Sequence, residues 1–170
     1  VDANSTMQAE KTGGLQTLSS GIWTASGDFK MKADIKGVSA NSAKLGFYKV
    51  DNLTGAIKTD AGLVEASSNE AYKAAVLDNL VSTSLTSLVG KNKSGSAELN
   101  LKENDYFAAV LFTTNASGVE RSLYSISSAN PSQSIQFLNL GNNTFGFEDL
   151  LLGIDSGFDG DFNDVTFNLA

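Results

Sequence analysis

The segment FKMKADIK, residues 29–36, alternates apolar and charged side chains without interruption. Successive side chains of a β-strand point to opposite faces, so this alternation predicts a strand with one face in a core and one in water. Ala43, Leu45 and Phe47 repeat the alternation soon afterwards. Residues 51–55, DNLTG, have the composition of a tight turn and precede an expected returning strand at 56–58.

Further strand signals continue along most of the chain. Residues 106–112 are nearly all apolar, which is typical of a strand buried on both faces. Alternation or short apolar runs predict the remaining strands at 97–101, 119–124, 135–138, 145–152 and 165–169. About nine short strands separated by polar turns favour a β-sandwich.

One helical pattern interrupts the strands. Ser67 lies three residues before Glu70, the spacing of a capping box. Apolar residues then recur at helical spacing at Ala71, Ala74, Ala75, Leu77, Leu80 and Val81. Leu85 and Leu88 extend the pattern by a further turn before Gly90. The predicted fold class is therefore all-β, a β-sandwich with one or two short helices inserted.

Length and composition indicate one domain. The chain has 170 residues, which suits a single hydrophobic core. The polar residues 1–20 are expected to form an N-terminal arm, a linker or a first edge strand, and residues 21–170 the sandwich. No apolar run approaches the ~18 residues of a membrane span. Because Val1 does not resemble a natural start, we expect a monomeric domain of a longer chain.

Two missing residue types and the net charge exclude several classes of function. The sequence has neither cysteine nor histidine. Disulfides, thiolate zinc sites and imidazole-dependent catalysis are thereby excluded. The net charge of −7 makes nucleic acids and anionic membrane surfaces unfavourable partners.

The C-terminal region concentrates carboxylates without any nearby cation in the sequence. No lysine or arginine follows Arg121, and phenylalanines are interleaved with the acids. Because the aromatic rings favour the core, the carboxylates need a neutralising partner, and a hard divalent ion with oxygen ligands is the simplest one. Calcium tolerates loose geometry and is preferred over magnesium, while the absence of His and Cys disfavours zinc. The candidate metal ligands are Glu148, Asp149, Asp155, Asp159, Asp161, Asn163 and Asp164.

The spacing of these residues supports a common site. Asp159, Asp161 and Asn163 lie two residues apart, so an extended backbone places them on one face. Asp164 is out of phase and is expected to bind backbone amides or a second ion. The alternative interpretation is an acidic loop exposed to solvent.

The same C-terminal residues resemble a bacterial domain family of nominally unknown function, found in secreted repeats-in-toxin (RTX) proteins and large surface adhesins. That family ends in the signature FGFEDL…DxDFNDxxF, which residues 145–150 and 159–167 match closely. Weaker similarity covers most of residues 43–170, including GFYKVD at 46–51 and SANP at 128–131. A departure occurs at residues 153–159, GIDSGFD, where the family has a more compact glycine pair.

The resemblance implies a calcium-dependent β-sandwich, secreted or on the cell surface, that acts in cell adhesion or biofilms as a non-enzymatic module. Its implied partner is a peptide or protein on another cell, bound at a free C-terminus, and Arg121 is a candidate clamp for a carboxylate. A calcium-dependent carbohydrate-binding module is the first alternative, with Trp23, Tyr48 and Tyr106 as sugar-stacking candidates, although core packing also explains them. A structural spacer is the second. A glycosidase would require Glu148 and Asp161 as its acid and base.

Overall fold

The computed structural model of the chain describes residues 15–19, 21–37, 42–82, 85–88, 93–115, 117–149 and 164–169. These residues contain thirteen strands, one α-helix and two short 3-10 helices. The strands are β1 Leu15–Ser19, β2 Ile22–Ala25, β3 Phe29–Gly37, β4 Ser42–Val50, β5 Ile57–Thr59, β6 Gly62–Val64, β7 Thr86–Leu88, β8 Lys93–Leu101, β9 Tyr106–Thr114, β10 Glu120–Tyr124, β11 Phe137–Gly141, β12 Thr144–Phe147 and β13 Val165–Asn168. The helices are α1 Glu70–Leu77, η1 Ser127–Ala129 and η2 Pro131–Gln133.

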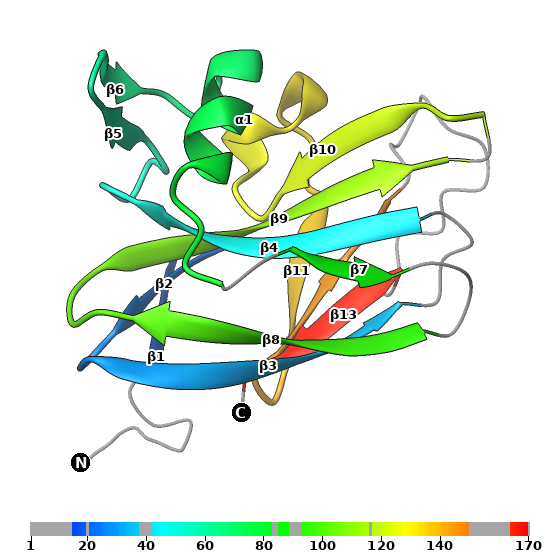
Figure 1. The fold of residues 1–170 in the computed structure, drawn as a ribbon, viewed down its shortest axis with the longest axis horizontal. Coiled ribbons are helices and arrows are strands. Elements are labelled where there is room, and N and C mark those ends of the chain that lie inside the picture. The colour runs from blue at the N-terminus through cyan, green and yellow to red at the C-terminus, as the bar shows by residue number, and fades with distance from the viewer. Residues whose placement is uncertain are drawn as a thin grey trace.

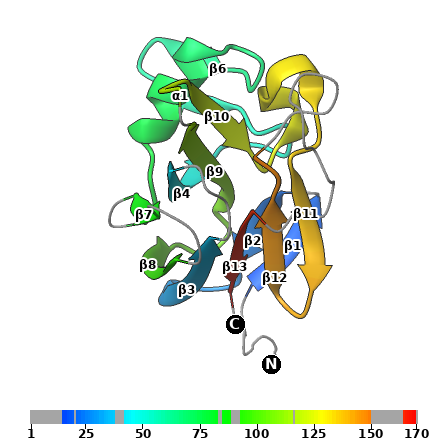
Figure 2. The ribbon, with the colours of Figure 1, turned by 90° about the vertical axis from the view of Figure 1, so that its right-hand side faces the viewer.

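Two antiparallel sheets form the body of the molecule. Sheet A has the order β1-β2-β9-β4-β7, and β10 also pairs with β9. Sheet B has the order β11-β12-β13-β3-β8. Figures 1 and 2 show the two sheets facing each other, with the short β5–β6 hairpin and α1 on the side of sheet A that faces away from sheet B. The predicted all-β sandwich is confirmed.

The core between the sheets is dominated by aromatic side chains from both. Trp23 of β2 stacks on Phe107 of β9, with 5.6 Å between ring centroids, and meets Phe145 of β12 edge-on at 5.0 Å. Phe167 of β13 contacts Phe47 of β4 edge-on at 5.1 Å. These rings bury large apolar areas and pair in geometries that favour their quadrupoles, so they fix how sheet B lies on sheet A.

A second core covers part of the outer face of sheet A. The Tyr48 hydroxyl of β4 donates to the Tyr72 hydroxyl of α1 at 2.9 Å, because the single hydroxyl proton of Tyr72 is donated to the carbonyl of Gly55 at 2.7 Å. Tyr124 of β10 packs edge-on against both rings. Burial raises the pKa of all three tyrosines, that of Tyr124 to about 12. The eight-residue helix is therefore held on the sheet by its tyrosine.

The nine predicted strands agree with the structure in type and approximate position, with two differences, and the structure adds β1, β2, β6 and β7. β9 is buried on both faces, as its apolar run predicted. The strand expected at 145–152 ends at Phe147, so Glu148 and Asp149 lie just beyond it. The strand after the 51–55 turn was expected to return along the preceding strand. It is β5, and it pairs with β6 instead of β4.

The helix prediction was right in place and wrong at both ends. Asn69 precedes the helix at φ 52° without a side-chain capping bond, so Ser67 does not form the expected capping box. The helix ends at Leu77, and the next residues extend instead: the Val81 amide donates to the Phe47 carbonyl at 2.8 Å, and the Val81 carbonyl accepts from Asn100 at 2.9 Å. Leu88, expected in a second helical turn, belongs to β7. The backbone hydrogen bonds of Val81 to both sheets therefore outweigh the helical periodicity of residues 78–81.

The N-terminal segment contributes to the sandwich. Leu15–Ser19 form β1, an edge strand of sheet A paired with β2. Residues 1–14 lie outside the described part. Among the described residues, no helix combines the length and apolar character needed to cross a membrane.

Candidate metal centre

The register of β12 and β13 brings two carboxylates together at one end of sheet B. Phe147, the last residue of β12, is paired with Val165, the first residue of β13. In an antiparallel pair the next residues outward are also opposite, so Glu148 and Asp164 face each other just beyond the strands. The Asp164 amide continues the ladder by donating to the Phe147 carbonyl at 3.1 Å. Asp149 follows Glu148 and completes a cluster of three acids.

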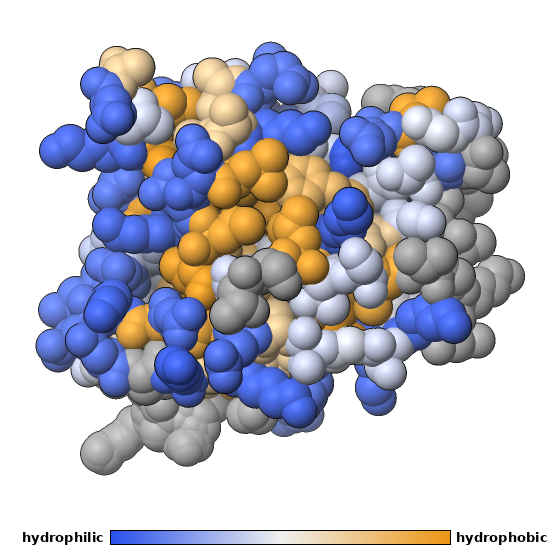
Figure 3. Space-filling model, in the orientation of Figure 1, coloured by the Kyte–Doolittle hydropathy of each residue, from blue (hydrophilic) through white to orange (hydrophobic). Residues whose placement is uncertain are grey.

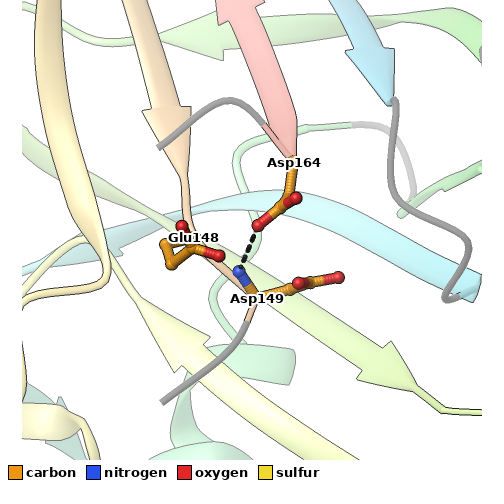
Figure 4. A group of neighbouring side chains, drawn as sticks. All are labelled: Glu148, Asp149 and Asp164. Carbon is orange, nitrogen blue, oxygen red and sulfur yellow. Dashed lines mark hydrogen bonds between the residues drawn. The ribbon is translucent and has the colours of Figure 1, made fainter. Parts of the chain in front are cut away.

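Backbone hydrogen bonds hold this end of the sheet in place. The Glu148 amide donates to the Gln136 carbonyl at 2.9 Å, and the Gln136 side-chain amide donates back to the Glu148 carbonyl at 2.7 Å. The Asp149 amide donates to Asp164 Oδ2 at 3.0 Å, as Figure 4 shows. The three acids therefore stand on a backbone fixed by β11, β12 and β13.

The cluster gathers negative charge in a place that water reaches poorly. Glu148 is fully buried and Asp149 is 4% exposed, whereas Asp164 is partly exposed. One carboxylate oxygen from each residue lies within 4.8 Å of the other two. Like charges at such a separation repel each other, and burial strengthens that repulsion. An arrangement of this kind favours a bound cation.

The spacing suits a single divalent ion. Calcium binds oxygen ligands at ~2.3–2.6 Å, so ligands on opposite sides of one ion are about 4.6–5.2 Å apart. Oxygens within 4.8 Å of one another can therefore share one such ion. Three carboxylates supply between three and six oxygens, and calcium accepts six to eight, so further oxygen ligands would complete the shell.

The structure brings together three of the seven residues predicted as metal ligands, Glu148, Asp149 and Asp164. The other four, Asp155, Asp159, Asp161 and Asn163, lie outside the described residues, in the segment of sequence that connects Asp149 to Asp164. Asp164 binds a backbone amide, one of the two roles expected for it. Gln136 was not predicted, because a single glutamine before an apolar strand carries no signal in the sequence.

The residues predicted to bind a ligand do not belong to the carboxylate cluster and lie in different parts of the fold. Trp23 and Tyr48 are buried in the two cores at 1% and 0% exposure, which is unfavourable for stacking on a sugar. Tyr106 is partly buried. Arg121 lies in β10 and lines a groove of about 700 Å³ on sheet A. Of the pair considered for glycosidase chemistry, Glu148 is fully buried and Asp161 lies outside the described residues.

The fold and the site together define an antiparallel β-sandwich with a buried carboxylate cluster at one end of a sheet, able to hold a metal ion. Residues 92–170 match the model of a family described as a domain of unknown function (DUF4114). The match extends from the start of β8 to β13 and includes all three acids of the cluster. No curated protein and no solved structure matches the chain.

Proposed function

We propose that this chain is a calcium-dependent ligand-binding module of a bacterial surface adhesin, and that it is not an enzyme. The observation that carries the proposal is the cluster of Glu148, Asp149 and Asp164, whose carboxylate oxygens approach within 4.8 Å in a largely buried position. Calcium is preferred because carboxylates are its usual ligands and because it tolerates the coordination that a loop offers.

Calcium would be held first by these three residues, with Asp155, Asp159, Asp161 and Asn163 as candidates for the remaining positions. When bound, the ion supplies the positive charge that the sequence lacks after Arg121 and an open position for a ligand oxygen. The chain's own contribution is rigidity, since Gln136 and the β12–β13 ladder fix the backbone that carries the acids.

The adhesin assignment rests on the resemblance of residues 145–150 and 159–167 to the signature of RTX adhesin domains. Under this proposal the chain lies outside the cell, as one monomeric domain of a larger protein. The proposed partner is a peptide or protein C-terminus on another cell, because a terminal carboxylate can meet a bound cation. The match of residues 92–170 to a family of unknown function is compatible with this assignment.

Thermal unfolding of the chain with calcium, with magnesium and with chelator tests the metal. An ion that binds only the native state stabilises it by about 2.7 kcal/mol at a hundredfold excess over its Kd. For a domain of this size the Tm should then rise by about 5–10 °C. We expect the largest rise with calcium. Identical melting curves in calcium and chelator would remove the basis of the proposal.

Peptide arrays with free and amidated C-termini, probed in calcium and in chelator, test the ligand. We expect binding to require both a free terminal carboxylate and calcium. A glycan array run in parallel addresses the lectin alternative, and binding to glycans with no selection among peptides would replace the peptide assignment.

A further inference from the structure

A groove on the outer face of sheet A lies apart from the carboxylate cluster. The second core, built around Tyr48 and Tyr72, covers only part of this face. Beside this core, and partly lined by it, lies a groove of about 700 Å³, within the size range of ligand sites. Figure 3 shows hydrophobic side chains gathered next to α1 and over β4, with hydrophilic ones around them. Leu77 of α1, which lines the groove, is 43% exposed.

The floor of the groove is a row of four side chains across four strands. Lys44 of β4 is paired with Ser87 of β7 on one side and with Phe112 of β9 on the other, and Phe112 is paired with Ser122 of β10. Neighbouring strands lie about 4.8 Å apart, so the row is about 14 Å long. An extended peptide of about four residues has the same length.

Two lysines are neighbours of the aromatic ring in this floor. Lys44 is the cross-strand neighbour of Phe112, and Lys73 reaches over from α1 with its Nζ 5.6 Å from the ring centroid. Two like charges near one apolar ring favour an anion beside them, while the ring and Leu77 offer an apolar contact. The groove is thus suited to a ligand that combines carboxylates with an apolar side chain.

The charge of the groove differs in sign from that of the whole molecule. Three cations line it, Lys44, Lys73 and Arg121, against two carboxylates, Glu70 and Glu120. The chain as a whole carries −7. An acidic ligand repelled by most of the surface would therefore be attracted here.

We propose that this groove binds a short acidic peptide segment in an extended conformation, with an apolar side chain against Phe112 and carboxylates beside Lys44 and Lys73. None of the three acids of the carboxylate cluster lines it. The inference goes beyond the proposed function, because the peptide's side chains and not its C-terminus are recognised and no metal is needed in the groove.

The test is an NMR titration of the ¹⁵N-labelled chain, in calcium buffer, with the blocked peptide acetyl-Asp-Leu-Asp-Phe-Asp-amide. Versions with Asn or Lys in place of Asp serve as controls for charge, and the amide removes any terminal carboxylate. We expect shift changes at Lys44, Lys73 and Phe112 with the Asp peptide, and weaker or no changes with the others. Equal responses to all three peptides, or no response at millimolar concentration, would overturn the proposal.

Charge-reversal variants locate the binding. Lys44→Glu and Lys73→Glu should each lower the affinity for the Asp peptide by about fivefold or more, since an attractive ion pair becomes a repulsive one. Lys36→Glu, an exposed lysine on the outer face of sheet B, is the matched control and should leave the affinity unchanged. An equal loss of affinity in all three variants would indicate that only the long-range charge of the protein matters, and would refute binding in the groove. Melting curves verify that each variant is folded.

Discussion

Neutralising Glu148 should have opposite consequences with and without calcium. Two unit charges 4.8 Å apart repel by about 3.5 kcal/mol at an effective dielectric near 20. Glu148→Gln removes two such interactions, with Asp149 and with Asp164, at nearly constant volume. Solvent near the partly exposed Asp164 and the cost of fitting an amide reduce the gain. We expect the variant in chelator to be more stable than the wild type by about 1–3 kcal/mol, a rise in Tm of about 3–10 °C.

In calcium the order should reverse. The wild type gains the binding free energy of the ion, whereas the variant has lost one charged ligand and should gain little. Differential scanning calorimetry of both proteins, in calcium and in chelator, measures all four states of this cycle. Glu65→Gln, an exposed acid before α1, is the matched control and should behave as the wild type. A Glu148→Gln protein that is destabilised in chelator and still responds fully to calcium would refute the electrostatic reasoning.

Other parts of the fold give further expectations. Gly21→Ala should cost more than about 3 kcal/mol, because a Cβ there would lie 2.1 Å from the Ser125 carbonyl oxygen at a φ of +85°; Gly118→Ala, at φ +80° with nothing within 4 Å, should cost only about 1 kcal/mol, and equal losses in urea unfolding would contradict this. Burial raises the pKa of Tyr124 to about 12, against ~10 in the unfolded chain. The neutral side chain's contribution to the free energy of unfolding is therefore complete below pH 10 and is lost as pH rises from 10 through 12. Tyr124→Phe should therefore flatten the fall in unfolding free energy over that range, and an unchanged slope would count against it.

The sandwich could be predicted because each strand has a recognisable pattern of apolar and polar residues within its own sequence. The alternation at 29–36 and the apolar run at 106–112 correspond to β3 and β9. What periodicity does not contain is which strands pair. β5 follows a turn that suggests a hairpin with β4, yet its partner is β6. The helix is shorter than predicted for a similar reason, since Val81 makes backbone hydrogen bonds to both sheets, and the local sequence does not indicate these bonds.

The acids of the site could be predicted, but their setting could not. Glu148, Asp149 and Asp164 stand out because no cation follows Arg121 in the sequence. Their closeness depends on the β12–β13 register, a long-range property. Gln136 holds the Glu148 backbone through bonds that become visible only when β11 is placed beside β12. The groove over Phe112 likewise results from the pairing of four strands, β7, β4, β9 and β10, with β4 and β9 at its centre.

The position of β13 has a consequence for biosynthesis. This strand pairs with β12 on one side and with β3 on the other. A ribosome synthesises β3 early and β12 and β13 late, so β13 joins an early part of the sheet to a late one. Until Val165–Asn168 have emerged, β3 lacks a neighbour on one side, and Phe47 lacks the ring of Phe167. Sheet B is complete only after residues 165–168 have been translated, so a nascent chain should lack its full sandwich until those residues are available.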